Sequence, residues 1–257
     1  MKRPIERAKI PLLFAAIILV FLVFLVFRGK NTNTLAKGDR VYGGVFSYSL
    51  PEPLTSLFPL ETNSLSELRI ISQLFDPLVK QADAKGTIQN YLANEILIKN
   101  KGKLVKIKLK RGVLFHDDAC FTAGSPRELT AKDVSFTLSL ACSNNPLNQS
   151  GSLLIGKIVG SDSFFKKGMR PEKNTVSGIR IINDYELEIQ LTQPYNNFKQ
   201  LLTHPSLGIL SKTSWTYYGK TLRDHPVGSG PFYIKSTTSS EIQLAKNNDY
   251  WMHDKFG

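Results

Sequence analysis

The clearest strand signal in the chain is an alternation of apolar and lysine residues over residues 104–110. The apolar positions are Val105, Ile107 and Leu109, and the lysines are Lys106, Lys108 and Lys110. A period of two is expected when one face of a strand is buried and the other is solvated. We therefore predict a half-buried strand here.

Two helices are predicted from their start signals. Thr130 is followed three residues later by Asp133, and Ser64 is followed three residues later by Glu67. A hydroxyl and an acid at this spacing are typical of a capping box. We expect the earlier helix to end at Asp76, because the residue before a proline disfavours the helical conformation. The apolar residues expected on the buried faces are Val134, Leu138 and Ala141 in the later helix, and Leu65, Leu68, Ile71 and Phe75 in the earlier one.

The second half of the chain shows hairpin and loop patterns. Residues 179–182 and 185–191 are strand-like and are joined by an Asn-Asp dipeptide, which predicts a hairpin. Residues 232–234 and 242–244 form a second candidate pair. Residues 144–173 are rich in Asn, Ser, Gly and Lys, which favours a loop with short helical pieces. These patterns predict an α/β fold with long connections.

An apolar run at residues 10–27 is long enough to span a membrane. At about 1.5 Å per residue it reaches about 27 Å, close to the thickness of the hydrocarbon core. The cations before it are Lys2, Arg3, Arg7 and Lys9, and they favour a cytoplasmic N-terminus with the rest of the chain exported. No small-x-small site follows the run, so we favour an uncleaved anchor over a cleaved signal peptide.

Composition indicates a folded protein without nucleic-acid chemistry. The chain has 257 residues, 42% of them hydrophobic and 21% charged, which is enough for one or two domains with a real core. The net charge is +12, but the first 40 residues hold eight Lys and Arg against two acids. No basic helix or aromatic-basic platform is present, so nucleic acid is not an expected partner.

No residue pattern indicates an enzyme or a cofactor. Residues 227–231 read Val-Gly-Ser-Gly-Pro, which lacks the outer glycines of a nucleophile elbow and the third glycine of a dinucleotide loop. His116-Asp117-Asp118 has donor atoms for a metal, but a strand-end histidine before a solvated acidic turn is the better interpretation. The other histidines show no His-x-x-x-His spacing. We expect no catalytic residues, no metal and no cofactor.

The two cysteines, Cys120 and Cys142, flank the loop and the helix that follow the strand at residues 104–110. Export would permit a disulfide between them. Such a bridge would stabilise the fold by roughly 3 kcal/mol in the chain-entropy model. Two free buried thiols are the alternative.

Five motifs in the same order resemble the family 5 extracellular solute-binding proteins, which are the oligopeptide-, dipeptide- and nickel-binding components of ABC importers. The core motif reads Leu-Lys-Arg-Gly-Val-Leu-Phe-His-Asp-Asp and then Leu-Thr-Ala-Lys-Asp-Val-Ser-Phe within residues 109–136. The other motifs lie at residues 73–79, 91–95, 226–232 and 247–251. The resemblance covers roughly residues 43–257.

This resemblance implies a periplasmic-binding-protein-like (type II) fold of the α/β class, with a mixed sheet and an inserted subdomain. Family members have two lobes around the ligand and are usually about twice as long, so the chain resembles the N-terminal half without the second lobe. The implied division is a signal-anchor transmembrane segment at residues 1–28, a linker at 29–40, and the N-terminal part of the solute-binding domain at 41–257.

The resemblance also implies a ligand site and a function. In the family, the loop between the first strand and the first helix contacts the ligand. Spacing carries that role onto Glu61, Thr62, Asn63, Ser64 and Leu65, although Asn63 and Ser64 have helix capping as an alternative role. Phe58 stands where many members have Asp.

The implied function is binding of a peptide or another small solute outside the cytoplasm, for delivery to an ABC permease. A single-pass anchor would hold the domain at the cell membrane on the periplasmic side. The alternative is a membrane-anchored remnant of the same fold, sensory or structural, that binds nothing.

Overall fold

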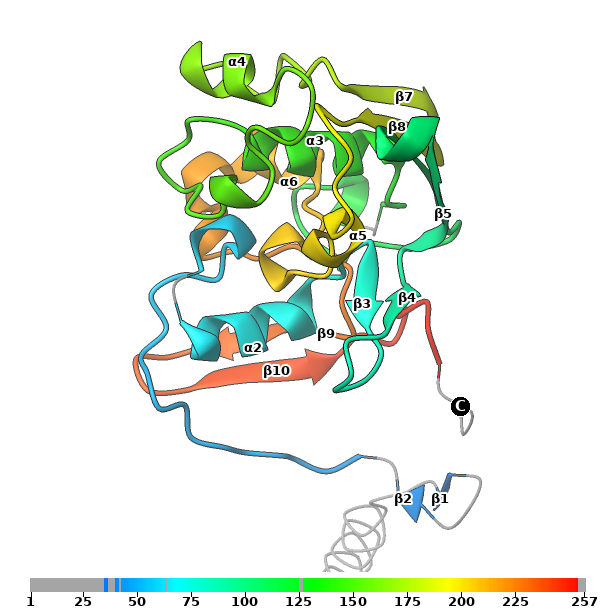
Figure 1. Cartoon of the computed structure of the whole chain (residues 1–257). Helices are drawn as coiled ribbons and strands as arrows, with labels where there is room; N and C mark the ends of the chain where they lie inside the picture. The colour runs from blue at the N-terminus through cyan, green and yellow to red at the C-terminus, as the bar shows by residue number, and fades with distance from the viewer. Residues whose placement is uncertain (1–34, 37–39, 42, 63, 125–126, 254–257) are drawn as a thin grey trace, which may run out of the picture. The chain divides into compact units, whose positions relative to one another are not determined.

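The computed structural model describes residues 35–36, 40–41, 43–62, 64–124 and 127–253 (Figure 1). The chain divides into a larger unit, residues 49–252, and a smaller unit formed by the residues on either side. In the smaller unit, β1 (Leu35–Ala36) and β2 (Arg40–Val41) form a short antiparallel pair. Among the described residues, no helix is long and apolar enough to cross a membrane. The apolar run at residues 10–27 lies outside them.

Four antiparallel strands form the main sheet of the larger unit. Their order is β5 (Ala93–Lys99), β6 (Leu104–Leu109), β8 (Glu186–Gln190) and β7 (Ile179–Asn183). The predicted alternation in β6 is confirmed, because Val105, Ile107 and Leu109 are buried and Lys106 and Lys108 are exposed. On the solvated face, Glu188 of β8 pairs with Lys106 and with Arg180. The predicted hairpin is also confirmed as the β7–β8 pair.

Every strand pair in the described part of the chain is antiparallel. The two further pairs are β3 (Val79–Gln81) with β4 (Ile88–Asn90), and β9 (Phe232–Thr237) with β10 (Ile242–Lys246). The second of these confirms the pairing expected for residues 232–234 and 242–244. The prediction of a mixed sheet, with both parallel and antiparallel strands, is wrong for the described residues. Most of these pairs are hairpins, whose short connections return the chain antiparallel, whereas parallel pairs need a crossover.

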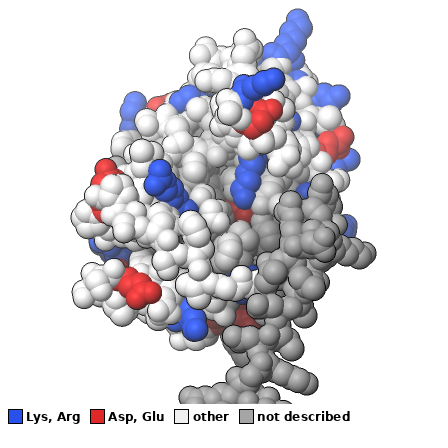
Figure 2. All heavy atoms as spheres, turned by 90° about the horizontal axis from the view of Figure 1, so that it is seen from below, with Lys and Arg blue, Asp and Glu red and all other residues white. Residues whose placement is uncertain are grey.

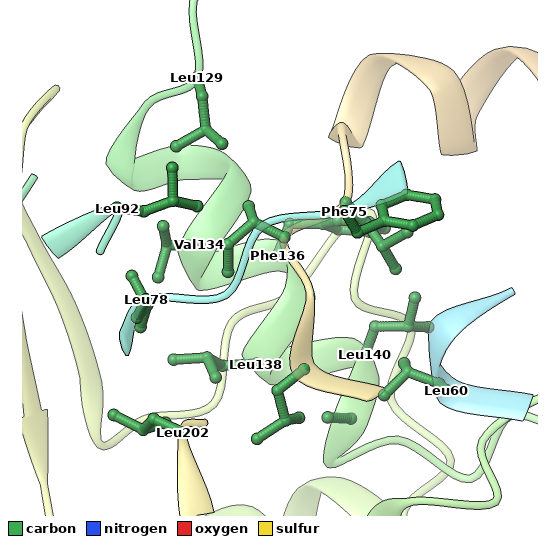
Figure 3. Close-up of a cluster of buried hydrophobic side chains, with 14 of the residues drawn as sticks. Leu60, Phe75, Leu78, Leu92, Leu129, Val134, Phe136, Leu138, Leu140 and Leu202 are labelled. Atoms are coloured by element: carbon green, nitrogen blue, oxygen red, sulfur yellow. The ribbon is translucent and has the colours of Figure 1, made fainter. Parts of the chain in front are cut away.

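Helix α3 (Ala131–Ala141) lies at the centre of the core. It starts at Thr130 with Asp133 as the third helical residue, as predicted, and every α3 residue except Lys132 is buried. Figure 3 shows its apolar side chains among residues from several other segments. The labelled residues are Leu60, Phe75, Leu78, Leu92, Leu129, Val134, Phe136, Leu138, Leu140 and Leu202. Helix α3 therefore joins the sheet to the rest of the unit.

Helix α2 (Leu65–Leu74) starts at the predicted capping box of Ser64 and Glu67. Its last residue is Leu74 and its C-cap is Phe75, so it ends just before the predicted stop at Asp76. It lies beside the β9–β10 pair (Figure 1). Its buried residues are Ser66, Glu67, Ile70, Ile71 and Leu74. The predicted face was therefore wrong at Leu65, which is 68% exposed. The inward side is the one that carries Glu67 and Ile71, four residues apart, and Leu65 points away from it.

Short helical pieces make up the remaining elements of the larger unit. The α-helices are α4 (Ser161–Lys166), α5 (Phe198–Leu201) and α6 (Lys212–Tyr218). The 3₁₀ turns are η1 (Pro59–Glu61), η2 (Asn100–Gly102), η3 (Thr122–Gly124), η4 (Gly151–Leu153), η5 (Pro205–Leu207) and η6 (Gly219–Arg223). Only η4 and α4 lie within residues 144–173, which confirms the predicted loop with short helical pieces.

Candidate ligand-binding site

One buried carboxylate holds both ends of the loop at residues 55–65. Glu67 is 1% exposed. Its Oε1 accepts hydrogen bonds from the N–H of Thr55 at 2.9 Å, the hydroxyl of Thr55 at 2.6 Å and the N–H of Ser56 at 3.2 Å. Its Oε2 accepts from the N–H of Ser64 at 3.2 Å. The acid of the capping box thus also fixes the chain that enters the loop, and hydrogen bonds to a charged acceptor are among the stronger ones.

Glu61, the first predicted contact residue, has protein partners of its own. The Ser56 hydroxyl donates to its Oε2 at 2.7 Å, and Arg223 Nη2 lies 3.5 Å from its Oε1. Arg223 also donates to the Thr55 carbonyl at 2.9 Å, and its own carbonyl accepts from the Leu57 N–H at 3.2 Å. The charge of Glu61 is therefore compensated within the chain. Its role in this structure is to hold the loop.

Thr62 and Leu65 differ in how they are placed. The Thr62 hydroxyl donates to the Pro59 carbonyl at 2.9 Å and accepts from the Ser206 hydroxyl at 2.8 Å. The backbones of Thr62 and Ser64 are extended. Leu65 projects into solvent as a large exposed apolar side chain. The predicted contact at Asn63 falls on a residue outside the described part of the chain.

Apolar packing beneath the loop keeps it in place. Leu57, Phe58 and Leu60 are buried. The centres of the Phe58 and Trp215 rings are 5.6 Å apart. Phe58, which stands where many family members have Asp, is therefore a core residue in this chain. The Leu60 carbonyl accepts from the Gln149 N–H at 2.8 Å. A loop held from so many sides loses little conformational freedom when a ligand binds.

The partners that hold the loop are distant in sequence, and sequence reasoning missed them. Gln149 lies in the segment 144–173 that was predicted as a loop, and no pattern was assigned at Ser206 or Arg223. A local signal existed for Glu67 alone, because its spacing from Ser64 marks a capping box. The sequence therefore located the loop but did not reveal what fixes it.

The loop at residues 55–65 is separate from two open cavities of the larger unit. Two open cavities lie elsewhere among the described residues. One of about 480 Å³ is at the starts of α3 and α6, and one of about 630 Å³ is beside Trp251. Neither is lined by Glu61, Thr62, Ser64 or Leu65.

His116 has a structural role. It is 6% exposed, its Nε2–H donates to the Gly230 carbonyl at 2.9 Å, and its backbone N–H donates to the Gly228 carbonyl at 2.7 Å. Burial lowers the pKa of His116, although the Gly230 carbonyl and Asp117 oppose that change. In the described part of the chain, no group of three or more His, Cys, Asp and Glu residues is placed to hold a metal.

Both cysteines are free and buried in the structure. This matches the alternative of two free buried thiols and not the candidate disulfide between Cys120 and Cys142. Cys120 lines the cavity at the start of α3, and Cys142 follows the last residue of α3. A helix of this length extends about 16 Å, whereas a disulfide requires Cα atoms within about 7 Å. Burial raises the pKa of each thiol to about 12, so both stay protonated and unreactive at neutral pH.

On the side of the molecule shown in Figure 2, the described Lys and Arg residues lie apart and alternate with Asp and Glu. This distribution differs from the basic stripe that nucleic-acid binding requires.

The sequence matches a known family and its relatives. Residues 87–256 match the model of the bacterial extracellular solute-binding proteins, family 5 Middle. The glutathione-binding protein GsiB of Salmonella choleraesuis is 24% identical over 198 residues, which are 77% of this chain and 33% of that protein. GsiB of Pectobacterium atrosepticum gives the same identity and coverage. The chain thus spans about a third of the length of the curated relatives it matches.

Solved structures share the fold. DppA from Helicobacter pylori, in complex with the peptide STSA, is 24% identical with a TM-score of 0.64, over 79% of this chain and 39% of that one. Listeria monocytogenes OppA bound to peptide is 23% identical with a TM-score of 0.64, over 76% of this chain and 37% of that one. The fold is therefore the mixed α/β fold of periplasmic binding proteins. Because the family model matches more than half of the chain, the protein belongs to the bacterial extracellular solute-binding proteins of family 5.

Proposed function

We propose that this chain forms a lobe of the solute-binding component of an ABC importer and that its ligands are peptides. The observation that carries the proposal is the family match over residues 87–256. Two related structures, DppA with the peptide STSA and OppA bound to peptide, support the ligand class. In this proposal residues 41–257 are the N-terminal part of a type II solute-binding domain with an inserted subdomain.

The loop before α2 suits a contact with a peptide backbone. Thr62 and Ser64 are extended, and an extended segment can pair with an extended ligand through backbone groups. Leu65, 68% exposed, offers apolar surface to a ligand side chain. Backbone pairing with roomy side-chain contacts would accept many peptide sequences. We therefore propose Thr62, Asn63, Ser64 and Leu65 as the contact residues, with Glu61 holding them in position.

Nuclear magnetic resonance of the ¹⁵N-labelled full chain in detergent micelles tests this assignment. Added STSA peptide is expected to shift the amide resonances of Thr62, Ser64 and Leu65. Leu65→Asp should abolish the shifts, and an acid in the first turn of a helix is well tolerated. Ile182→Asp, at another exposed apolar position, is the matched control and should leave them unchanged. Shifts confined to other residues would contradict the site, and no shifts with STSA or a mixed tripeptide library would favour the non-binding remnant.

The N-terminal segment belongs to the proposal as a membrane anchor. We propose that residues 1–28 remain attached and hold the domain at the outer face of the cytoplasmic membrane, with residues 29–40 as the linker. The long apolar run, its preceding cations and the absence of a cleavage pattern support this. N-terminal sequencing of the protein recovered from membranes should read Met1 or Lys2. A start between residues 35 and 38 would show cleavage and free export instead.

A further inference from the structure

Asp76 is a buried carboxylate whose partners come from the far end of the larger unit. It lies between α2 and β3 and is 0% exposed. Its Oδ2 accepts from the Trp251 indole N–H at 2.9 Å, and its Oδ1 accepts from the Tyr250 hydroxyl at 3.3 Å. Lys80 Nζ lies 3.6 Å from Oδ1. One side chain therefore binds two consecutive aromatic residues that lie more than 170 positions later.

Aromatic rings and lysine ammonium groups lie around Asp76 and contact one another. The Tyr91 hydroxyl donates to the Tyr250 hydroxyl, and the Tyr91 ring meets the Trp251 ring edge-on at 5.0 Å. Lys80 Nζ lies 3.7 Å from the centre of the Tyr91 ring, and Lys110 Nζ lies 4.2 Å from the centre of the Trp251 ring. The titratable groups that face Asp76 are thus Lys80, Lys110, Tyr91 and Tyr250. A buried carboxylate needs such partners, because removal from water penalises its charge.

The backbone around Asp76 is fixed, whereas the segment it binds is held by side chains. The Asp76 carbonyl accepts from the Ile209 N–H at 2.9 Å. Asn247 is tied down by its N–H on the Pro231 carbonyl at 2.8 Å and by its side-chain amide on the Gly230 carbonyl at 3.1 Å. Beyond Asn247, the tertiary hydrogen bonds of the described residues are those of Tyr250 and Trp251. Asp76 therefore holds residues 250–252 together with Tyr91 and Lys110.

We propose that Asp76 is the positioning residue for residues 250–252 and that a proton on its carboxyl strengthens their attachment. The functional meaning rests on the proposed function, in which the larger unit belongs to a ligand-binding lobe, and residues 250–252 are the last residues of that unit. Asp76 would then set the direction in which the chain leaves the lobe. The ionised carboxylate would make that connection easier to detach at neutral pH.

The direction of the pH effect follows from linkage. Burial raises the pKa of Asp76 to about 6, although Lys80, Trp251 and Tyr250 each lower it. In a detached state water would solvate the carboxylate, and its pKa would return toward about 4. The attached state therefore binds the proton more tightly. Attachment is strongest below about pH 4 and weakens, by up to about 100-fold, as the pH rises through about 6.

Fluorine NMR of the full chain labelled with 5-fluorotryptophan tests the proposal, because the chain has two tryptophans. The Trp251 signal reports the attachment of residues 250–252 to Asp76, and the Trp215 signal reports the fold. His253→Gln serves as the background, so that the nearby imidazole does not contribute to the titration. Broadening of the Trp251 signal by a dissolved nitroxide should increase with pH, with a midpoint near 6. Asp76→Asn, a neutral isostere, should keep the low broadening at every pH, and Asp76→Ala should show high broadening throughout.

Two further variants complete the test. Lys80→Met removes the ammonium group that favours the charged carboxylate, so the midpoint should move to higher pH; this remains decisive if Asp76→Asn does not fold. Asp249→Asn, a change at a neighbouring acid, should leave the midpoint in place. A Trp251 signal that does not change with pH in the parent, an unchanged titration in Asp76→Asn, or an unmoved midpoint in Lys80→Met would each overturn the proposal. No peptide is added, so failure of ligand binding would not affect the result.

Discussion

At the scale of single residues, two glycines pack directly against the backbone of α2. The Gly230 N–H donates to the Leu74 carbonyl at 2.9 Å and so binds one of the last carbonyls of α2. A Cβ at Gly228 would lie 1.9 Å from the Leu74 oxygen, and one at Gly230 would lie 2.3 Å from the Gln73 oxygen. Both obstacles are backbone atoms, which cannot move aside like the end of a side chain. These glycines are required because another backbone passes so close.

Gly228→Ala is therefore expected to destabilise the fold strongly. The added methyl group must push the turn away from α2, which also strains the His116 contacts. The free energy of unfolding should fall by about 3 kcal/mol or more, measured by urea unfolding followed by circular dichroism. Gly86→Ala is the control, because Gly86 has a positive φ but only one distant neighbour, at 3.8 Å. It should cost only about 1 kcal/mol, and equal effects of the two changes would contradict the packing argument.

At the scale of elements, one buried acid starts two helices. Asp133 is 1% exposed, and its Oδ2 accepts from the N–H and the hydroxyl of Thr130, both at 3.0 Å. Its Oδ1 accepts from Arg127 Nη2 at 2.5 Å and from the Lys212 N–H at 3.1 Å. Thr130 is the N-cap residue of α3, and Lys212 is the first residue of α6. The side chain thus satisfies terminal N–H groups that neither helix can bond internally.

Asp133→Ala should destabilise both helix starts at once. It leaves the Arg127 guanidinium without its carboxylate partner and the Thr130 and Lys212 N–H groups without the acceptor that Asp133 supplies. We expect a loss of about 3 kcal/mol or more in the free energy of unfolding. Glu95→Ala is the matched control, because Glu95 pairs with Lys108 on the solvated face and should cost less than about 1 kcal/mol. A loss at Asp133 no larger than that at Glu95 would contradict its double role.

At the scale of the whole molecule, the chain spans about a third of the length of its curated relatives. The proposed contact residues Thr62, Ser64 and Leu65 line neither the cavity at the starts of α3 and α6 nor the cavity beside Trp251. In a two-lobed receptor both sides of the cleft supply contacts and exclude water. Each factor of ten in affinity corresponds to about 1.4 kcal/mol. If one side of the cleft is missing, a few hydrogen bonds and one charge pair to the ligand are lost. That loss lowers the affinity for the ligand by several powers of ten.

This chain alone should bind peptides more weakly than micromolar. Isothermal calorimetry of the full chain in detergent with a mixed peptide library should give no saturable heat in the micromolar range. The NMR shifts proposed for Thr62, Ser64 and Leu65 would then need millimolar peptide. Micromolar or tighter binding in calorimetry would mean that the chain forms a complete site by itself.

The sequence by itself determined the features that depend on neighbours along the chain. The alternation in β6, the β7–β8 hairpin and the starts of α2 and α3 each follow from side chains a few residues apart. Motif order indicated the family in the same way. The sequence also indicated the loop before α2, because its spacing is a local property.

Only the tertiary structure decided which distant residues meet. Nothing local pairs Glu61 with Arg223, or Asp76 with Trp251. The inward side of α2 was likewise set by what packs on it, which left Leu65 exposed. Such contacts depend on how all the elements pack together, and a buried charge or a close glycine contact has meaning only once its distant partner is in place.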